Sequence, residues 1–149
     1  EFASATQTAT LNVRNSGGAI YGAVLANLFK FNGNSVTKEY YINDYGNQIK
    51  NFTKYVFFRL REIKFNEKFT NQKNLYPGDY VIDIAKKILI DIPTIDLTNF
   101  ENIFSTLSEM SLNYSMILIK DDLKSLGISH DNYVSEKFLV NKNLVDKSI

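Results

Sequence analysis

Apolar residues recur every three or four positions in four stretches of this 149-residue chain, which is the spacing of one face of an α-helix. The first predicted helix follows Gly17-Gly18, and its apolar positions are Ile20, Val24, Leu25, Leu28 and Phe29. The second runs from about residue 45 to 64, with apolar Ile49, Phe52, Val56 and Leu60. A third is predicted between Pro77 and Pro93, and a long fourth from about Asn99 to Leu126.

Turn and cap residues mark the ends of these helices. Asn32-Gly33 and Gly127 are expected to end the first and the fourth, because glycine adopts the left-handed conformation at a helix C-terminus. Asp44 is expected to be the N-cap of the second. Strands are predicted at 1–6, 35–43 and 131–140, and a polar loop or arm at 65–75. This order favours a single α/β domain over residues 1–149, with a mainly parallel sheet and flanking helices.

Composition argues against several classes of function. The chain has no cysteine and one histidine, which excludes disulfides and thiolate metal sites and argues against a histidine-based triad. His130 itself is expected at the surface or at a strand edge. Because 17 basic and 16 acidic side chains are dispersed along the chain, no DNA-binding surface is predicted. No apolar run approaches the ~20 residues of a membrane span and no signal peptide is recognised, so we expect a cytoplasmic location without membrane contact.

Four ordered blocks of sequence carry a resemblance to a known family. They read EFASATQTATLNVRNSGGAIYGAVLANLF, VTKEYYINDYGNQI, LYPGDYVIDIAKKI and DDLKSLGISHDNYVSE. Together they resemble the first half of the catalytic domain of arginyl-tRNA synthetases, which are class I aminoacyl-tRNA synthetases. The resemblance implies a partial Rossmann-like fold. It also implies ATP with Mg²⁺, arginine and tRNA as ligands, if the family's function is retained.

The first block departs from the family at its signature. The family pattern is Glu-Phe-x-Ser-Ala-Asn-Pro-Thr-Gly-Pro-Leu-His-Ile-Gly-His-Ala-Arg-Gly. Asn12 and Asn15 replace its two histidines, Val13 its isoleucine and Arg14 its glycine, whereas Gly18 is retained. The resemblance therefore implies degenerate catalytic positions at Asn12 and Asn15. It implies degenerate nucleotide-binding positions at Val13, Arg14 and Gly18.

These replacements weaken the chemistry that the resemblance implies, in which two imidazoles stabilise negative charge on the α-phosphate of ATP. An asparagine amide donates only a neutral hydrogen bond, and charge-assisted bonds are about twice as strong. Losing one preorganised donor in such a site costs roughly 10²–10³ in rate. The side chain of Arg14 is expected to intrude where glycine lets adenine approach the backbone; alternatively, its guanidinium reaches a phosphate. Loss of two prolines and a net loss of one glycine predict a mobile or refolded loop over residues 4–19.

Two further groups of residues match the family. The arginine-binding positions implied by the resemblance are Glu1, Ser4 and Thr6, although the family has asparagine where this chain has Thr6. A carboxylate such as that of Glu1 suits bidentate pairing with a guanidinium. The second block matches at Asn43, Asp44, Gly46 and Gln48. Because a helix cap and a tight turn explain this loop, a structural role is favoured there.

These observations give one leading hypothesis and two rivals. The leading hypothesis is a fragment of an arginyl-tRNA synthetase catalytic domain without independent aminoacylation activity, which acts as a structural or binding module or is a decaying remnant. The rivals are one half of a split arginine–tRNA ligase that needs a second chain, and a sensor of arginine or a nucleotide. The family's second signature, Lys-Met-Ser-Lys, does not occur in these residues. No metal site and no cofactor of its own are predicted. A truncated parallel sheet exposes an edge, so we expect self-association or a partner protein that covers it.

Overall fold

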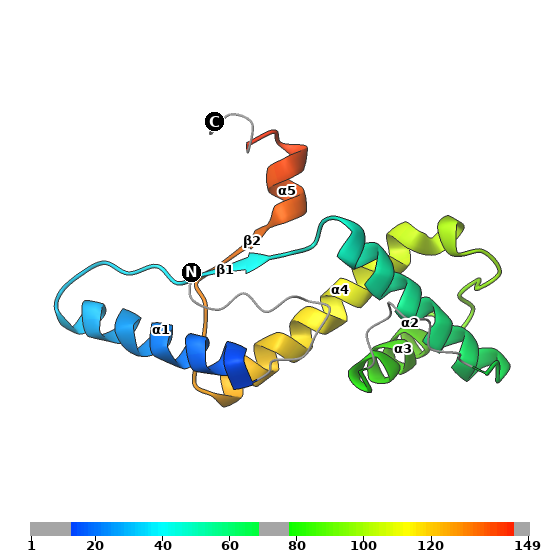
Figure 1. Ribbon diagram of the computed structural model, residues 1–149, viewed down its shortest axis with the longest axis horizontal. Coiled ribbons are helices and arrows are strands. Elements are labelled where there is room, and N and C mark those ends of the chain that lie inside the picture. The colour runs from blue at the N-terminus through cyan, green and yellow to red at the C-terminus, as the bar shows by residue number, and fades with distance from the viewer. Residues whose placement is uncertain (1–12, 69–77, 145–149) are drawn as a thin grey trace. The chain divides into compact units, whose positions relative to one another are not determined.

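The computed structural model describes residues 13–68 and 78–144, and it describes only the backbone of residues 13–15 (Figure 1). The chain divides into two compact units. Unit 1 comprises Glu1–Tyr45 and Ile117–Ile149, and unit 2 comprises Gly46–Met116. The described elements are α1 (Val13–Phe31), β1 (Glu39–Ile42), α2 (Asn47–Phe65), α3 (Tyr80–Asp91), α4 (Phe100–Ser125), β2 (Asn132–Ser135) and α5 (Glu136–Asn141). The prediction of a single domain stays a prediction.

Unit 2 contains α2, α3 and the first part of α4, and most of its buried side chains are apolar. The four positions predicted for the second helix, Ile49, Phe52, Val56 and Leu60, are all buried, which confirms that prediction. α2 packs against α3, where Val81, Ile84, Ala85 and Ile88 are buried. The rings of Phe52 and Tyr80 stack with their centroids 6.5 Å apart. Because burying one large apolar side chain is worth about 1.5–3 kcal/mol, this helix pair is a substantial source of stability for unit 2.

Unit 1 contains two strands that pair in parallel. β1 and β2 form a two-stranded sheet in the described part of unit 1, as Figure 1 shows. Tyr40 of β1 lies opposite Tyr133 of β2, and Tyr40 is fully buried. Parallel pairing is therefore confirmed for these two strands. The strand predicted at 1–6 lies outside the described residues.

The prediction of a strand over residues 131–140 is wrong in its second half. β2 ends at Ser135, and α5 begins at the next residue. The Ser135 hydroxyl accepts a 3.0 Å hydrogen bond from the backbone N–H of Phe138, which makes Ser135 the N-cap of α5. Because this bond satisfies an N–H that the first turn of a helix leaves unpaired, it favours a helix over a continued strand.

The first predicted helix exists, but it begins earlier than Gly17-Gly18. α1 starts at Val13, and both glycines are in helical conformation within it. Its predicted end is confirmed: Gly33 has a φ of 84°, and the N–H of Asn34 bonds to the carbonyl oxygen of Phe29 at 3.0 Å. This is the glycine-terminated helix end expected from the sequence.

The face of α1 that is buried is lined by small residues. Ala19, Gly22 and Ala26 are buried, whereas the apolar positions predicted for this helix are 39–58% exposed. These exposed positions are Ile20, Val24, Leu25, Leu28 and Phe29. Small side chains permit close approach of neighbouring chain segments, so the packed side of α1 is the small-residue side.

The remaining predicted boundaries agree closely with the structure where it describes them. α3 and α4 lie within a few residues of the third and fourth predicted helices. Gly127, with a φ of 71°, ends α4 as expected, and the N–H of Ile128 bonds to the carbonyl oxygen of Leu123 at 2.9 Å. In the predicted loop at 65–75, Phe65 ends α2, residues 66–68 have no regular structure, and residues 69–75 lie outside the described part.

Candidate functional site

The residues equivalent to the family signature lie at the start of α1. Val13, Arg14 and Asn15 form its first turn, so their backbone is helical where the sequence predicted a loop. Gly18 follows in the same helix and is exposed. The first-turn N–H groups of a helix have no partner within the helix, and together with its dipole they favour an anion.

Four of the predicted site residues lie outside the described part of the chain. They are Glu1, Ser4, Thr6 and Asn12. The arginine-binding positions and the first degenerate catalytic position thus remain predictions.

Asp44 is the best-defined polar residue of the second matching block. Its Oδ2 accepts a 2.6 Å hydrogen bond from the hydroxyl of Ser135, and its Oδ1 accepts a 2.9 Å bond from the backbone N–H of Lys137. The carboxylate thus lies at the N-terminus of α5, where the helix dipole stabilises negative charge. The prediction that Asp44 caps the helix beginning near residue 45 is wrong. Its partner helix is α5, which it reaches because β1 and β2 run side by side.

Gly46 is the residue that precedes the first turn of α2. It has a φ of 89° and a ψ of −172°, a conformation open almost only to glycine. The backbone conformation alone explains why position 46 is a glycine, so no bound ligand is needed to explain it. Gln48 is exposed in the first turn of α2, and Asn43 is half-buried after β1. The boundary between the two units falls between Tyr45 and Gly46, so the matching block belongs partly to each unit.

A second polar cluster lies where β1 and β2 begin. The N–H of Lys38 donates a 2.7 Å hydrogen bond to Oδ2 of Asp131, whose own N–H returns a 2.7 Å bond to the Lys38 carbonyl. This backbone bond holds the pKa of Asp131 below its usual value. His130 is half-buried beside them, and burial together with the charge of Lys38 lowers its pKa. A neutral imidazole is therefore favoured at this position.

Aromatic rings surround His130. Its ring lies edge-on to Tyr40 with centroids 5.3 Å apart, and 6.0 Å from the ring of Tyr133. The ammonium of Lys120 lies 4.2 Å from the Tyr133 ring centroid, within the range of a cation–π contact. Burial raises the pKa of the Tyr133 hydroxyl. The surroundings of His130 are thus those of a packed residue two positions before β2.

The sequence reasoning missed Ser135 and Lys120. Serine followed directly by glutamate is a common helix start, so the Ser135-Glu136 pair was a readable signal for α5. Lys120 had no such signal, because its contact with Tyr133 joins α4 to β2 through the fold. Neither Ser135 nor Lys120 adds a chemical group that indicates a specific reaction at this site.

Two general features of the described residues bear on the kind of site. None of the helices in residues 13–68 and 78–144 is long and apolar enough to cross a membrane. Over the same residues, no group of three or more histidine, cysteine or carboxylate side chains is placed to hold a metal ion.

Comparison with known proteins relates the chain to one family of ligases. No family model matches it. Among curated proteins, the arginine–tRNA ligase of Pelagibacter ubique is 50% identical over 150 residues, which cover 100% of this chain and 26% of that protein. The arginine–tRNA ligase of Anaplasma phagocytophilum is 39% identical over 149 residues, covering 100% of this chain and 25% of that protein.

The fold agrees with a solved structure of the same family. A crystal structure of a chain described as a putative arginyl-tRNA synthetase from Campylobacter jejuni matches with a TM-score of 0.85 and 28% identity. The match covers 94% of this chain and 31% of that one. This chain spans about a quarter of the length of the curated relatives it matches. The resemblance first seen in the four sequence blocks is confirmed: over its whole length the chain is similar to a segment of arginine–tRNA ligases.

Proposed function

We propose that this chain is the N-terminal part of a class I, Rossmann-like catalytic domain of arginine–tRNA ligase type, and that it does not activate arginine by itself. The observation that carries the proposal is the combination of whole-length similarity with a changed signature. All of this chain aligns with part of a ligase at 50% identity. Yet the chain has Asn12, Arg14 and Asn15 where the family pattern has His, Gly and His.

The chemistry of these three positions supports the loss of independent activity. Two neutral amides replace two groups able to carry positive charge, and each lost preorganised donor costs roughly 10²–10³ in rate. Such losses need not add. The helix N-terminus formed by residues 13–15 supplies backbone N–H groups, but these alone do not replace a positive charge beside a transferring phosphate.

The second matching block supports a folded module. Asp44 has a structural partner in α5, and Gly46 is required by its backbone conformation. The family pattern at both positions is therefore explained by the fold alone. In this proposal the chain keeps the scaffold of the ligase segment, while its contribution to chemistry depends on parts supplied from elsewhere. A cytoplasmic location is part of the same expectation.

Arginine-dependent exchange of pyrophosphate into ATP tests the proposal. The purified chain is expected to show no exchange above a control without arginine. A triple variant, Asn12→His with Arg14→Gly and Asn15→His, is expected to bind ATP more tightly by calorimetry, because it restores the family signature. Exchange by the unaltered chain alone would refute the loss of activity. Equal ATP affinity of the two proteins would refute the role assigned to Arg14.

One observation favours a second function, that of one half of a split ligase. The large apolar residues of α1 are exposed, although their types are those of a helix core. A half-enzyme is expected to show such an uncovered surface. Mixing the chain with a polypeptide that comprises the rest of the Pelagibacter ubique ligase distinguishes the two functions. Arginine-dependent exchange that requires both chains supports the split ligase, whereas association without exchange supports the inactive module.

A further inference from the structure

Asparagine occurs 17 times in the chain, and Asn32 is the one asparagine that glycine follows. This pairing has a chemical consequence, because the backbone nitrogen of a residue can attack the side-chain amide of an asparagine directly before it. A Cβ on the attacking residue crowds that approach, and glycine lacks one. The Asn32-Gly33 pair is therefore the place in this sequence where such an attack meets the least steric resistance.

The Asn32-Gly33 pair lies in an open turn between α1 and β1. The side chains of residues 31–35 are all exposed, and nothing lies within 4 Å of the point where a Cβ on Gly33 would be. Connections between a helix and a strand run over the surface of proteins of any size, because a buried loop leaves backbone polar groups unpaired. Water thus reaches this turn, and none of the side chains of residues 31–35 holds it by packing in a core.

Backbone hydrogen bonds hold the turn instead. The N–H of Gly33 donates to the carbonyl oxygen of Lys30, and the N–H of Asn34 donates to that of Phe29, each at 3.0 Å. The first of these bonds engages the nitrogen that must attack, so the reaction requires the last turn of α1 to open. Helix ends open readily, and one exposed hydrogen bond slows the attack by no more than about tenfold. The fold therefore delays the reaction without preventing it.

Asn34 provides a comparison within the same turn. Its side-chain Nδ2 donates a 3.2 Å hydrogen bond to the carbonyl oxygen of Phe29, and the residue that follows it is Ser35. The hydrogen bond restricts rotation of the amide, and the Cβ of serine hinders the attacking nitrogen. Asn32 and Asn34 therefore share an exposed environment but differ in the reactivity expected of their side chains.

We propose that Asn32 is a site of spontaneous deamidation. In the first step the Gly33 nitrogen loses its proton and bonds to Cγ of Asn32, the bond from Cγ to Nδ2 breaks, and ammonia leaves with that proton. In the second step water adds to either carbonyl of the resulting succinimide ring and opens it. The products are aspartate and isoaspartate, and in isoaspartate the main chain runs through the former side chain. Water is the co-reactant, and no oxidation or reduction takes place.

Both products disturb the end of α1. Each places a carboxylate beside the last carbonyl groups of the helix, where negative charge is unfavourable, although Lys30 in the last turn partly compensates. Isoaspartate also adds one carbon to the main chain between α1 and the donors at Gly33 and Asn34. Their hydrogen bonds to the last turn cannot both keep their geometry. Deamidation is therefore expected to loosen this end of the helix.

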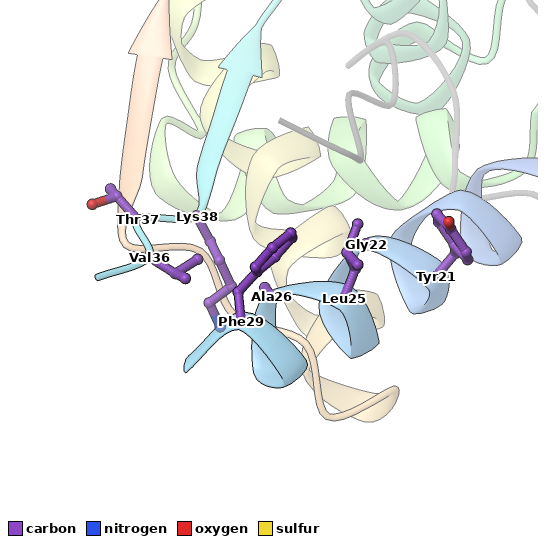
Figure 2. Close-up of a pocket in the computed structure, with 8 residues that line it drawn as sticks. All are labelled: Tyr21, Gly22, Leu25, Ala26, Phe29, Val36, Thr37 and Lys38. Atoms are coloured by element: carbon purple, nitrogen blue, oxygen red, sulfur yellow. The ribbon is translucent and has the colours of Figure 1, made fainter. Parts of the chain in front are cut away.

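The turn also joins the two walls of a hollow in unit 1. The hollow has a volume of about 370 Å³, and it lies between α1 and residues 36–38. Figure 2 shows the ring of Phe29 from the helix wall beside the stem of Lys38 from the opposite wall. Because residues 32–35 connect these walls, a looser turn is expected to affect the hollow as well as the helix.

Mass spectrometry of the aged 149-residue chain tests the proposal. The chain is incubated at mildly alkaline pH and digested with trypsin, which releases residues 31–38 as one peptide that holds both Asn32 and Asn34. A sample digested without incubation gives the background. Amide loss is expected at Asn32 before Asn34, with both aspartate and isoaspartate as products. Its rate is expected to rise in proportion to hydroxide concentration, because the attacking nitrogen must lose its proton.

Two variants at position 32 separate the chemistry from its structural effect. Asn32→Gln keeps an amide but requires a larger ring, so the expected result is loss of the reaction at this position. Asn32→Asp reproduces the aspartate product, and the amides of Gly33 and Asn34 are expected to exchange hydrogen faster in it than in the unaltered chain. Incubation in urea measures protection by the fold, and the unfolded chain is expected to react no more than about tenfold faster.

Three outcomes would overturn the proposal. The first is amide loss at Asn34 that equals or precedes the loss at Asn32. The second is aspartate without isoaspartate, which would indicate direct hydrolysis of the side chain instead of ring closure. The third is an Asn32 that reacts in urea but stays intact in the folded chain over the same period, which would show that the turn does not open. None of these outcomes depends on whether the chain activates arginine.

Discussion

The hydroxyl of Ser135 donates a 2.6 Å hydrogen bond to the carboxylate of Asp44, which lies 91 residues earlier in the chain. The same carboxylate accepts a bond from the N–H of Lys137, and the Ser135 hydroxyl accepts one from the N–H of Phe138. Two N–H groups that the first turn of a helix leaves unpaired are satisfied in this way. The bonds join the segment after β1 to the start of α5 within unit 1.

Asp44→Ala is expected to lower the free energy of unfolding by about 1–3 kcal/mol, because hydrogen bonds to a charged group are worth about 1.5–3 kcal/mol and the site is partly exposed. The loss is expected to concentrate at α5. Urea unfolding measures the total effect. Hydrogen exchange measures its location, with the amides of Lys137 and Phe138 expected to exchange faster.

Asp79→Ala is the matched control for this prediction. Asp79 also precedes a helix, α3, but its side chain makes no capping hydrogen bond. Its removal is expected to cost less than about 1 kcal/mol, the size of a helix-dipole interaction. Equal losses in the two variants would show that the bonds of Asp44 contribute nothing specific to stability.

Asp44 also shows what local sequence cannot reveal. Residues 131–140 contain Tyr133, Val134, Phe138 and Leu139, and these residue types are typical of a strand. This composition led to the wrong prediction over residues 136–140. The helix starts because Ser135 caps it and because Asp44 approaches from the segment that follows the neighbouring strand β1. The first cause is local and readable, whereas the second depends on a strand pairing between residues far apart in the chain.

Gly46→Ala is expected to destabilise the chain by about 1–3 kcal/mol. The reason is conformational. There is open space within 4 Å of the position that the alanine methyl would occupy, but the φ of 89° with a ψ of −172° is strained for any residue other than glycine. Denaturant titration followed by circular dichroism measures the change. An unaltered midpoint would contradict the backbone assigned to this turn.

Gly17→Ala is expected to have the opposite sign. Gly17 is helical in α1, is exposed, and also has nothing within 4 Å of the added carbon. Alanine in an exposed helix interior is roughly 0.5–1 kcal/mol more favourable than glycine. A loss of stability at this position would indicate that α1 begins later than Val13, as the sequence alone predicted.

The start and the packing of α1 mark another limit of prediction from sequence. Consecutive glycines predicted the end of a loop, yet Gly17 and Gly18 are both helical. Periodicity did predict the helix and its end at Asn32-Gly33. It did not predict which side is buried, because both sides of α1 are apolar and the choice depends on which residues allow close approach. By contrast, α2 has a single apolar face, and all four of its predicted core positions are buried.

His130 makes the stability of unit 1 depend on pH. Burial and the charge of Lys38 lower its pKa in the folded chain, although Asp131 partly opposes this. The unfolded chain, with an ordinary histidine pKa of about 6.5, then binds more protons than the folded chain at mildly acidic pH. The contribution of neutral His130 to stability is therefore fully present above about pH 6.5. It is expected to be lost as the pH falls through that value toward the pKa of His130 in the folded chain.

Urea unfolding at about pH 7.5 and about pH 5.5, on either side of the ordinary histidine pKa, measures this effect, with the lower stability expected at the lower pH. His130→Phe keeps a ring against Tyr40 and Tyr133 and removes the titrating group, so its stability is expected to change less between the two values. His130 is the only histidine in the chain, which makes the comparison direct. The same pH dependence in both proteins would assign the effect to another group.

Leu60 and Leu28 contrast a core position of unit 2 with an exposed position of α1. Leu60 is fully buried, and Leu60→Ala is expected to cost about 2–5 kcal/mol, as for other leucines removed from a packed core. Leu28 is 58% exposed, so Leu28→Ala in the 149-residue chain is expected to change the unfolding free energy by no more than about 0.5 kcal/mol. Both values come from denaturant titration of the same chain. A loss at Leu28 approaching that at Leu60 would mean that Leu28 is buried in the folded 149-residue chain, contrary to its exposed position in α1.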